Sequence, residues 1–283
     1  MKRVRKASPT QIALFIMTLM SVVGLALIFV FVIREGYPVF TKVGLKAFLF
    51  GREWLPTRGK FGALPLITAS LIIVVGSVLL ATPLGIGLAV YMVEYAPRLI
   101  RRWLKTIVEL LAGIPSVIFG FFGIIVLIPL TRQIFGGSGF GLIPAMVVLA
   151  IMILPTVTAV SADAIRAVPR ENRLIIFALG GTRWQVVRRG VLPPALRGIL
   201  TGVILAEGRA IGETMAVLMV IGNAPLMPKA LNQPAAALPS TIALDMAYAS
   251  GDHRTALFAI GALLLVFSAV LIFAARRIGK VRQ

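Results

Sequence analysis

Residues 66–93 read LITASLIIVVGSVLLATPLGIGLAVYMV and contain no charged side chain. A run of about 20 apolar residues is long enough to cross the hydrocarbon core of a bilayer as an α-helix. Five further runs of this kind lie at 12–33, 106–130, 142–160, 198–222 and 256–275. The sequence therefore predicts an all-α integral membrane protein with six transmembrane helices.

The composition agrees with this class. Of the 283 residues, 59% are hydrophobic and only 14% are charged, too few for the surface of a soluble domain of this size. The runs lack the alternating pattern of a membrane β-barrel. We expect the first run to be a lasting anchor rather than a signal peptide, because no small-residue cleavage site follows it.

The basic residues indicate an orientation. Nineteen Lys and Arg side chains fall on one side of a six-helix topology and nine on the other, within a net charge of +19. The positive-inside rule then places both termini in the cytoplasm of a cell-membrane protein. Because the charge is spread over separate segments beside the membrane, nucleic-acid binding is not expected.

The expected organisation follows from the runs and the charges. The outer loop contains Trp54, Pro56 and Phe61, which suggest an ordered segment at the membrane interface. Pro83, Pro115 and Pro155 interrupt the apolar runs, and at each of them either a helix break or ordinary kinked packing is expected. The predicted parts are a cytoplasmic tail at 1–11, a first helix at 12–33, an extracytoplasmic loop at 34–65, a five-helix domain at 66–275 and a cytoplasmic tail at 276–283.

The longest cytoplasmic loop, 161–195, contains a short apolar block at 174–179, LIIFAL. This block is too short to cross a membrane. Gly180 and Gly181 should end its helix, and Thr182 with Gln185 forms a capping box for a second helix. An apolar block at this surface needs a partner, which is either the core of this chain or another protein. The neighbouring arginines favour an acidic partner or anionic membrane lipid.

The fifth run carries two charges, Arg209 and Glu213, in the stretch AEGRAIGETMAV at 206–217. An arginine at the bilayer centre costs about 2.5–3.5 kcal/mol, so it is expected to face a cavity or a partner. In a continuous helix the two residues would share one face and could pair. The pair is then either a structural ion pair or part of a transport pathway.

The loop at 161–195 resembles the coupling loop of binding-protein-dependent ABC importer permeases. That family carries E-A-A, three residues, Gly, and then Leu-Pro about ten residues later. Gly180 and Leu192–Pro193 match the glycine and the end of this motif, whereas Leu174, Ile175 and Ile176 replace the E-A-A triplet.

Five further stretches resemble the phosphate-specific importers, and among them the PstC-type permease rather than its PstA-type partner. They are FGALPLI (61–67), ELLAGIPSVIFGFFG (109–123), AIMILPT (150–156), ALGGTRW (178–184) and GRAIGETMAVLMVIGN (208–223). The resemblance implies the type I ABC importer permease fold and phosphate transport.

The resemblance also implies partners. These are a PstA-type permease, two copies of a cytoplasmic PstB-type ATPase and an extracytoplasmic PstS-type phosphate-binding protein. The chain lacks a G-x-x-x-x-G-K-[ST] loop. We therefore expect the ATPase to use ATP and Mg²⁺, and we expect this chain to bind no cofactor. The residues expected to dock the ATPase are Leu174, Ile175, Ile176, Phe177, Ala178, Gly180 and Gly181.

Phosphate chemistry suggests roles for the two membrane charges. A guanidinium can bind two phosphate oxygens, so Arg209 is the expected anion contact and Glu213 its competitor. Three alternatives stay open: a permease for another oxyanion such as sulfate or molybdate, a passive anion channel or secondary transporter, and an intramembrane enzyme. The enzyme has least support, because the runs contain no His or Cys and no paired acidic motif.

Overall fold

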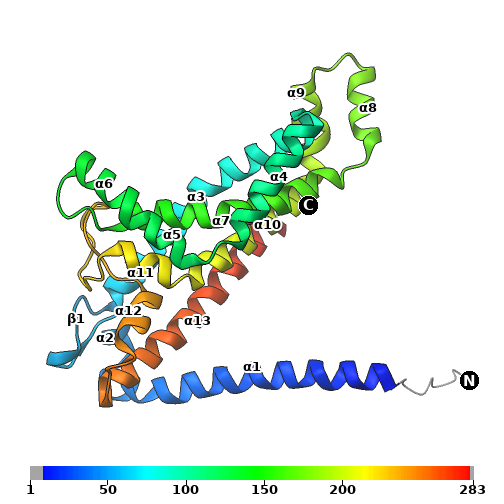
Figure 1. The fold of residues 1–283 in the computed structure, drawn as a ribbon. Coiled ribbons are helices and arrows are strands. Elements are labelled where there is room, and N and C mark those ends of the chain that lie inside the picture. Colours follow the sequence, from blue (N-terminus) through cyan, green and yellow to red (C-terminus); the bar gives the residue numbers. More distant parts are fainter. Residues whose placement is uncertain (1–8, 281–283) are drawn as a thin grey trace, which may run out of the picture.

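The computed structural model describes residues 9–280, and it is almost entirely helical (Figure 1). The α-helices are α1 (Pro9–Lys42), α2 (Leu45–Phe50), α3 (Leu64–Val90), α4 (Arg98–Gly113), α5 (Ser116–Phe122), α6 (Ile128–Phe135), α7 (Leu142–Arg166), α8 (Arg170–Ala178), α9 (Arg183–Gln185), α10 (Leu192–Gly212), α11 (Met215–Ile221), α12 (Leu238–Asp245) and α13 (Gly251–Lys280). Three π-helical segments continue from helices: η2 (Tyr91–Tyr95), η3 (Gly123–Leu127) and η4 (Val186–Val191).

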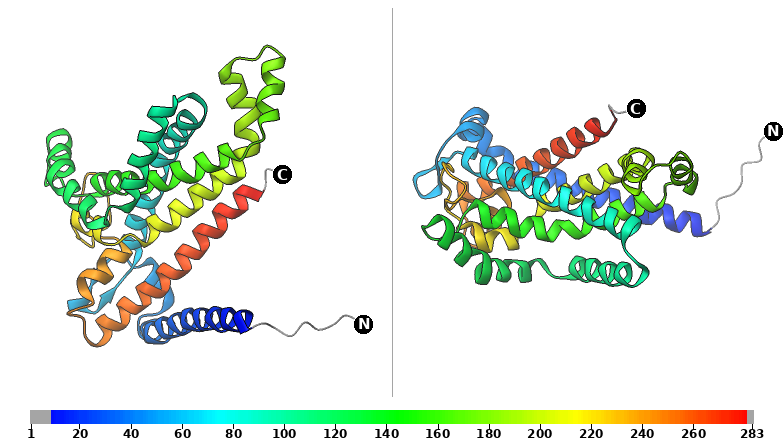
Figure 2. Two further views of the ribbon diagram at one scale, coloured as in Figure 1. Left: turned by 45° about the vertical axis from the view of Figure 1, so that its right-hand side comes forward. Right: turned by 90° about the horizontal axis from the view of Figure 1, so that it is seen from above.

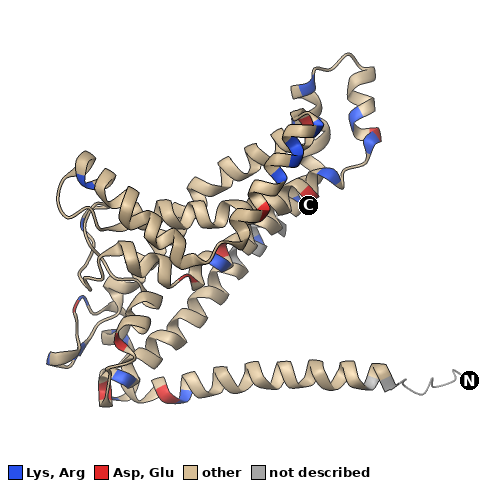
Figure 3. Cartoon of the chain, in the orientation of Figure 1, with Lys and Arg blue, Asp and Glu red and all other residues tan. Residues whose placement is uncertain are grey.

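Six helical segments are long and apolar enough to cross a membrane, as the sequence predicts. Within the described residues they are Ala13–Lys42, Leu64–Tyr95, Ser116–Phe135, Leu142–Arg166, Arg183–Gly212 and Gly251–Phe273. Figure 3 shows most charged residues toward the ends of the helices, with long uncharged stretches between them. The basic side chains of the tail at 1–8 lie outside the described residues.

Helices α3, α7 and α10 pack together at the centre of the bundle, and α3 and α7 form the most extensive contact. Glycines allow this close approach. A Cβ added to Gly85 of α3 would lie 2.8 Å from Cγ1 of Val157 on α7. A Cβ added to Gly202 of α10 would lie 3.0 Å from Cβ of Val160 on α7. Small residues at such crossings are typical of helices in membranes, where contact depends on close packing.

The end of the bundle opposite α8, here called the far end, carries a small second core. A two-stranded antiparallel sheet pairs β1 (Trp54–Leu55) with β2 (Lys60–Phe61), and Trp54 lies opposite Phe61. The Trp54 side chain is buried, in T-shaped contact with the Phe61 ring. The expectation of an ordered segment around these residues is confirmed. Lys60 lies 2.6 Å from Glu53 and lowers the pKa of that exposed carboxyl.

Helix α1 stands apart from the bundle. Its last part packs on α13, where Gly36 contacts the backbone of Ala259 and the Phe31 ring meets the edge of Phe258. From there toward the N-terminus, α1 diverges from the other helices, as two views show (Figures 1 and 2). Its apolar side chains between residues 13 and 30 are therefore exposed in the isolated chain.

Two of the predicted continuous spans are broken. The run at 106–130 is divided by Ile114 and Pro115, whose backbones are extended, because a residue before proline is disfavoured in the α conformation. The run at 198–222 ends as a helix at Gly212 and resumes at Met215. The first helix also continues past 33, through Pro38 to Lys42.

Both alternatives for the three prolines occur, since one proline marks a helix break and two lie within continuous helices. Pro115 marks a break, but Pro83 and Pro155 lie inside the continuous helices α3 and α7. A proline inside a transmembrane helix is tolerated where neighbouring helices pack around it. Pro155 is buried between such neighbours.

The close approach at Gly85 gives a testable prediction. Gly85→Leu should destabilise the protein by about 1–3 kcal/mol, the usual cost of overpacking a tight contact. Gly87→Leu is the matched control, since nothing lies within 4 Å of a Cβ at Gly87, on the same helix. Thermal unfolding of both variants in lipid nanodiscs measures the difference, and equal midpoints would contradict the role assigned to the α3–α7 contact.

Candidate functional site

The first candidate region is the break between α10 and α11, which contains Arg209 and Glu213. Arg209 lies half-buried in the last turn of α10. Glu213 follows the helix with an extended backbone, at ψ 125°. Gly212 immediately precedes it, and glycine is poorly suited to helix interiors. The chain therefore changes direction between the two charges.

The predicted ion pair between Arg209 and Glu213 is wrong. Both residues are in the described part of the chain, and the structure forms no ion pair between them, because they do not share one continuous helix. Glu213 instead accepts a hydrogen bond from the backbone N–H of Ala216, at 3.1 Å, and so caps the start of α11. Each charge thus lies next to a helix end whose dipole favours it. The Arg209 cation is at the C-terminus of α10, and the Glu213 anion is at the N-terminus of α11.

The two charged residues also face different surroundings. Glu213 lines a narrow cavity with residues of α3, α7 and α11, among them Ser70, Leu149 and Val217. Arg209 is not among the lining residues of that cavity. The structure therefore places both residues at the same break but does not bring their side chains to one site.

Glu207 of α10 is a further ionisable residue near this break, and the sequence analysis passed over it. Its side chain is half-buried, two residues before Arg209, and thus turned to another side of the helix. In the described part of the chain it has no hydrogen-bond or ion-pair partner. The signal was visible in the sequence, because a carboxyl inside an apolar run is itself a functional-site hypothesis.

The second candidate region is the loop between α7 and α10. Here the structure confirms the predicted corner: α8 ends at Ala178, and Gly180 has φ +77°, a conformation that favours glycine. The predicted capping box is also present. The Thr182 backbone N–H donates to Gln185 Oε1 at 2.8 Å, and the Gln185 N–H donates to Thr182 Oγ1 at 3.4 Å.

The apolar block on α8 is divided between two faces. Leu174, Ile175 and Phe177 are 64%, 59% and 48% exposed, and Ala178 lies beside them on the same surface. We call this surface the α8 apolar face. Ile176 differs from the expectation for a docking residue, because it is half-buried and packs inward on Gly190 of η4. One side chain of the block thus packs on the chain's own core, and the other side chains remain exposed.

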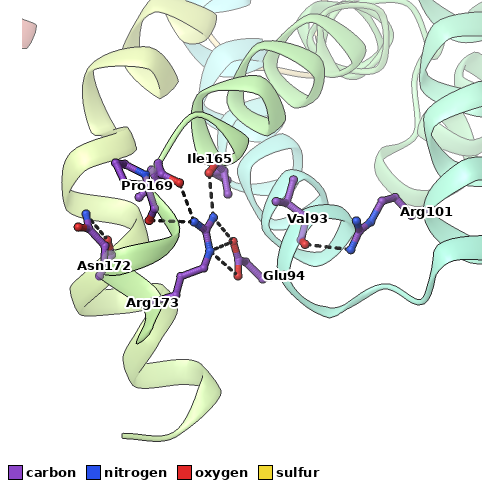
Figure 4. Close-up of polar contacts among 9 residues, drawn as sticks. Val93, Glu94, Arg101, Ile165, Pro169, Asn172 and Arg173 are labelled. Carbon is purple, nitrogen blue, oxygen red and sulfur yellow. Dashed lines mark hydrogen bonds and ion pairs between the residues drawn. The ribbon is translucent and has the colours of Figure 1, made fainter. Parts of the chain in front are cut away.

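Arg173 attaches α8 to the bundle, in an arrangement that the sequence did not suggest (Figure 4). Its Nη2 donates to Glu94 Oε1 at 2.7 Å and its Nε to the same oxygen at 3.2 Å. The guanidinium also donates to the carbonyls of Ile165 and Val168, at 3.0 and 2.8 Å. The two side chains are only 19% and 12% exposed. Since 79 residues separate them, no local pattern could have found this pair.

Neither region has the character of a metal site. Among residues 9–280, no three His, Asp or Glu side chains gather at one place. The single histidine, His253, lies 3.3 Å from Asp245 at the far end, remote in sequence from both regions. The two regions present a half-buried guanidinium at Arg209 and the exposed α8 apolar face.

Comparison with known proteins places the chain in a family. A family model described as "Binding-protein-dependent transport system inner membrane component" matches residues 81–281. The chain is 40% identical over 242 residues to the probable ABC transporter permease protein YqgH of Bacillus subtilis (strain 168), covering 83% of this chain and 78% of that protein.

Two further relatives carry the name phosphate transport system permease protein PstC. That of Mesorhizobium japonicum is 39% identical over 251 residues, covering 81% of this chain and 77% of the relative. That of Pasteurella multocida is 34% identical over 284 residues, covering 93% and 87%.

Solved structures share the fold. A chain of a bacterial alginate ABC transporter, in complex with an alginate pentasaccharide-bound periplasmic protein, aligns with a TM-score of 0.67 at 18% identity over 95% of both chains. A chain of the inward-facing MetNI methionine ABC transporter aligns with a TM-score of 0.62 at 23% identity, over 78% of this chain and 98% of that one. The type I ABC importer permease fold expected from the resemblance is confirmed. The chain therefore belongs to the family of binding-protein-dependent transport system inner membrane components, the permeases of ABC importers.

Proposed function

We propose that this chain is one permease subunit of an ATP-driven phosphate importer. The observation that carries the proposal is its 34–39% identity to proteins named PstC, over more than three-quarters of each chain. A sulfate or molybdate permease would have the same fold, so similarity to PstC proteins is what favours phosphate. A passive channel is disfavoured, because it has no use for an exposed apolar surface on α8.

The proposed complex contains four kinds of subunit. A PstA-type permease completes the membrane pathway, and two copies of a PstB-type ATPase use ATP and Mg²⁺. A PstS-type protein delivers phosphate from outside. The α8 apolar face supports an ATPase partner, since exposed apolar patches beside charged residues mark interaction sites. The segments at 34–60 and 223–255, which form the far end, are the proposed surface for the binding protein.

Arg209 is the proposed anion contact in the pathway. A guanidinium presents a rigid fork of donors that matches two phosphate oxygens. Because Arg209 is not neutralised by Glu213, it keeps its charge available, and the end of α10 offsets part of the cost of burying it. The contact to phosphate has to stay weak enough for release. Glu213 contributes by holding α11 in place.

The orientation of the chain can be tested with single cysteines, because the natural sequence has none. Thr57 at the far end and Ala178 on α8 are both exposed. A membrane-impermeant maleimide added to intact cells should label Thr57→Cys and leave Ala178→Cys unlabelled until the cells are broken. The reverse pattern would contradict the cytoplasmic placement of α8.

Removal of the membrane arginine should abolish transport without preventing assembly. Arg209→Ala removes the anion contact, and alanine suits a transmembrane helix. Arg209→Lys keeps the charge but loses the fork. Hydrogen bonds to charged groups contribute about 1.5–3 kcal/mol, so its uptake should fall roughly tenfold or more. The measurement is radiolabelled phosphate uptake by vesicles that contain the complex.

The control for Arg209 is Arg197→Ala, an exposed arginine near the start of the same helix. It should leave uptake close to that of the unaltered complex. Normal uptake by Arg209→Ala, with the ATPase content unchanged, would show that this residue is not in the pathway.

The α8 apolar face gives a prediction for ATPase binding. The double variant Ile175→Asp/Phe177→Asp should release the ATPase during purification while the permease stays folded, since both side chains are exposed. Ile176→Asp should instead lower the amount of permease itself, because this side chain packs against Gly190. Co-purification and membrane permease content distinguish the two results. ATPase retained by the double variant would exclude this face as the dock.

A further inference from the structure

The side chain of Arg173 is the most fully bonded guanidinium of the loop at 161–195. It extends into the junction between α8, α7 and the end of α3 (Figure 4). All three of its nitrogens donate: Nε and Nη2 to Glu94, Nη2 also to Ile165, and Nη1 to Val168.

These bonds tie α8 to the α3–α7 helix pair. Ile165 lies in the last turn of α7, and Val168 follows the end of that helix by two residues. Glu94 belongs to η2, the π-helical continuation of α3. Arg173 therefore joins one short surface helix to two of the three helices that form the centre of the bundle.

The neighbouring side chains of α8 connect it to the third of these helices. Asn172 Nδ2 donates to the Gly190 carbonyl at 3.5 Å, and Ile176 packs on the same glycine. Gly190 is part of η4, which leads directly into α10 and hence to Arg209. Helix α8 thus has two separate attachments, a polar one to α3 and α7 and a mainly apolar one to α10.

Stability alone does not explain the polar attachment. A buried ion pair is weak evidence for stability, since apolar side chains of similar size often serve as well. Its hydrogen bonds are directional, however, and five donors of one planar group fit their acceptors only in a narrow range of orientations. The pair therefore fixes how α8 sits on α3 and α7.

We propose that Arg173 and Glu94 are a positioning pair, through which movement of α8 on the ATPase is transmitted to the α3–α7 helix pair. The inference rests on the proposed function in that α8 is taken as the ATPase dock. Without the pair, a movement of α8 would still reach α10 through the contact with Gly190. The orientation of α8 relative to α3 would no longer be fixed. ATP hydrolysis would continue, and less of it would lead to transport.

Glu94→Gln is the test variant. It removes the charge that orients Arg173 but leaves the carbonyls of Ile165 and Val168 to hold the guanidinium, so α8 should stay folded on α7. A reversal of both charges is unsuitable, because a carboxylate at 173 would face those carbonyls.

Two matched controls separate the pair from general effects. Arg101→Gln removes hydrogen bonds to the Val93 and Ala96 carbonyls, at the same end of α3 but without touching α8. Asp163→Asn removes an ion pair at the same end of α7 that joins residues of one helix only.

The first measurement is the ratio of phosphate imported to ATP hydrolysed by the assembled complex, with subunit content and the thermal midpoint recorded. Glu94→Gln should lower this ratio roughly fivefold or more, the lower range of typical coupling between sites, while ATP hydrolysis is retained. Both controls should keep the ratio of the unaltered complex. A proportional loss of uptake, hydrolysis and subunit content in Glu94→Gln would make the pair merely structural and overturn the proposal.

The second measurement needs no substrate. Spin labels at Arg170→Cys on α8 and Leu84→Cys on α3, both exposed sites, should keep one narrow distance distribution with and without trapped nucleotide. In Glu94→Gln the distribution should broaden or shift on nucleotide binding. An unchanged distribution would refute the positioning pair. A different result would contradict only the proposed function. In that case the complex without substitutions imports no phosphate, but the spin-label distances behave as expected for the positioning pair.

Discussion

A helix that ends leaves backbone N–H and C=O groups without partners in the helix, and both candidate regions lie where this chain's helices end or break. At each place a charged side chain bonds to backbone groups beside the helix end. Glu213 accepts a hydrogen bond from the Ala216 N–H in the first turn of α11. Arg173 donates to the carbonyls of Ile165, in the last turn of α7, and of Val168, just after it. The charges in this apolar chain are therefore tied to its helix ends.

This constraint also explains why Arg209 and Glu213 do not pair. A continuous helix would have aligned them, but Gly212 ends α10 between them and each then meets a helix end of opposite sign. The arrangement leaves the guanidinium without a fixed carboxylate partner. In the proposed role as an anion contact, such an arginine could bind an anion directly, whereas a paired arginine would first have to lose an ion pair.

Much of the fold was predictable from local patterns. The six membrane segments follow from apolar length, and the corner at Gly180 with its Thr182 capping box follows from short-range backbone chemistry. The errors share one cause, the assumption that an apolar run is one straight helix. Gly212 lies within the run predicted at 198–222 although it ends α10, and Ile114 and Pro115 divide the run predicted at 106–130.

The features that could not be predicted depend on contacts between distant parts of the chain. Glu94 and Arg173 each look like ordinary charged residues beside a membrane, and only the packing of α3 on α7 brings them within 2.7 Å. The inward turn of Ile176 likewise depends on Gly190, which lies across the corner. Sequence periodicity reports which residues share a face of one element, and it carries no information on which element that face will meet.

The two attachments of α8 differ in kind, and this difference has a mechanical consequence. Ile176 on Gly190 is an apolar contact, which tolerates sliding because dispersion has little direction. The bonds of Arg173 are directional, so they resist rotation of α8 about its own axis. Both attachments reach π-helical segments, η2 and η4, where the regular α-helical hydrogen bonding is already interrupted. A rotation of α8 would therefore be transmitted to α3 through the directional hydrogen bonds of Arg173. A movement of α8 would reach α10 only through an apolar contact that can slide.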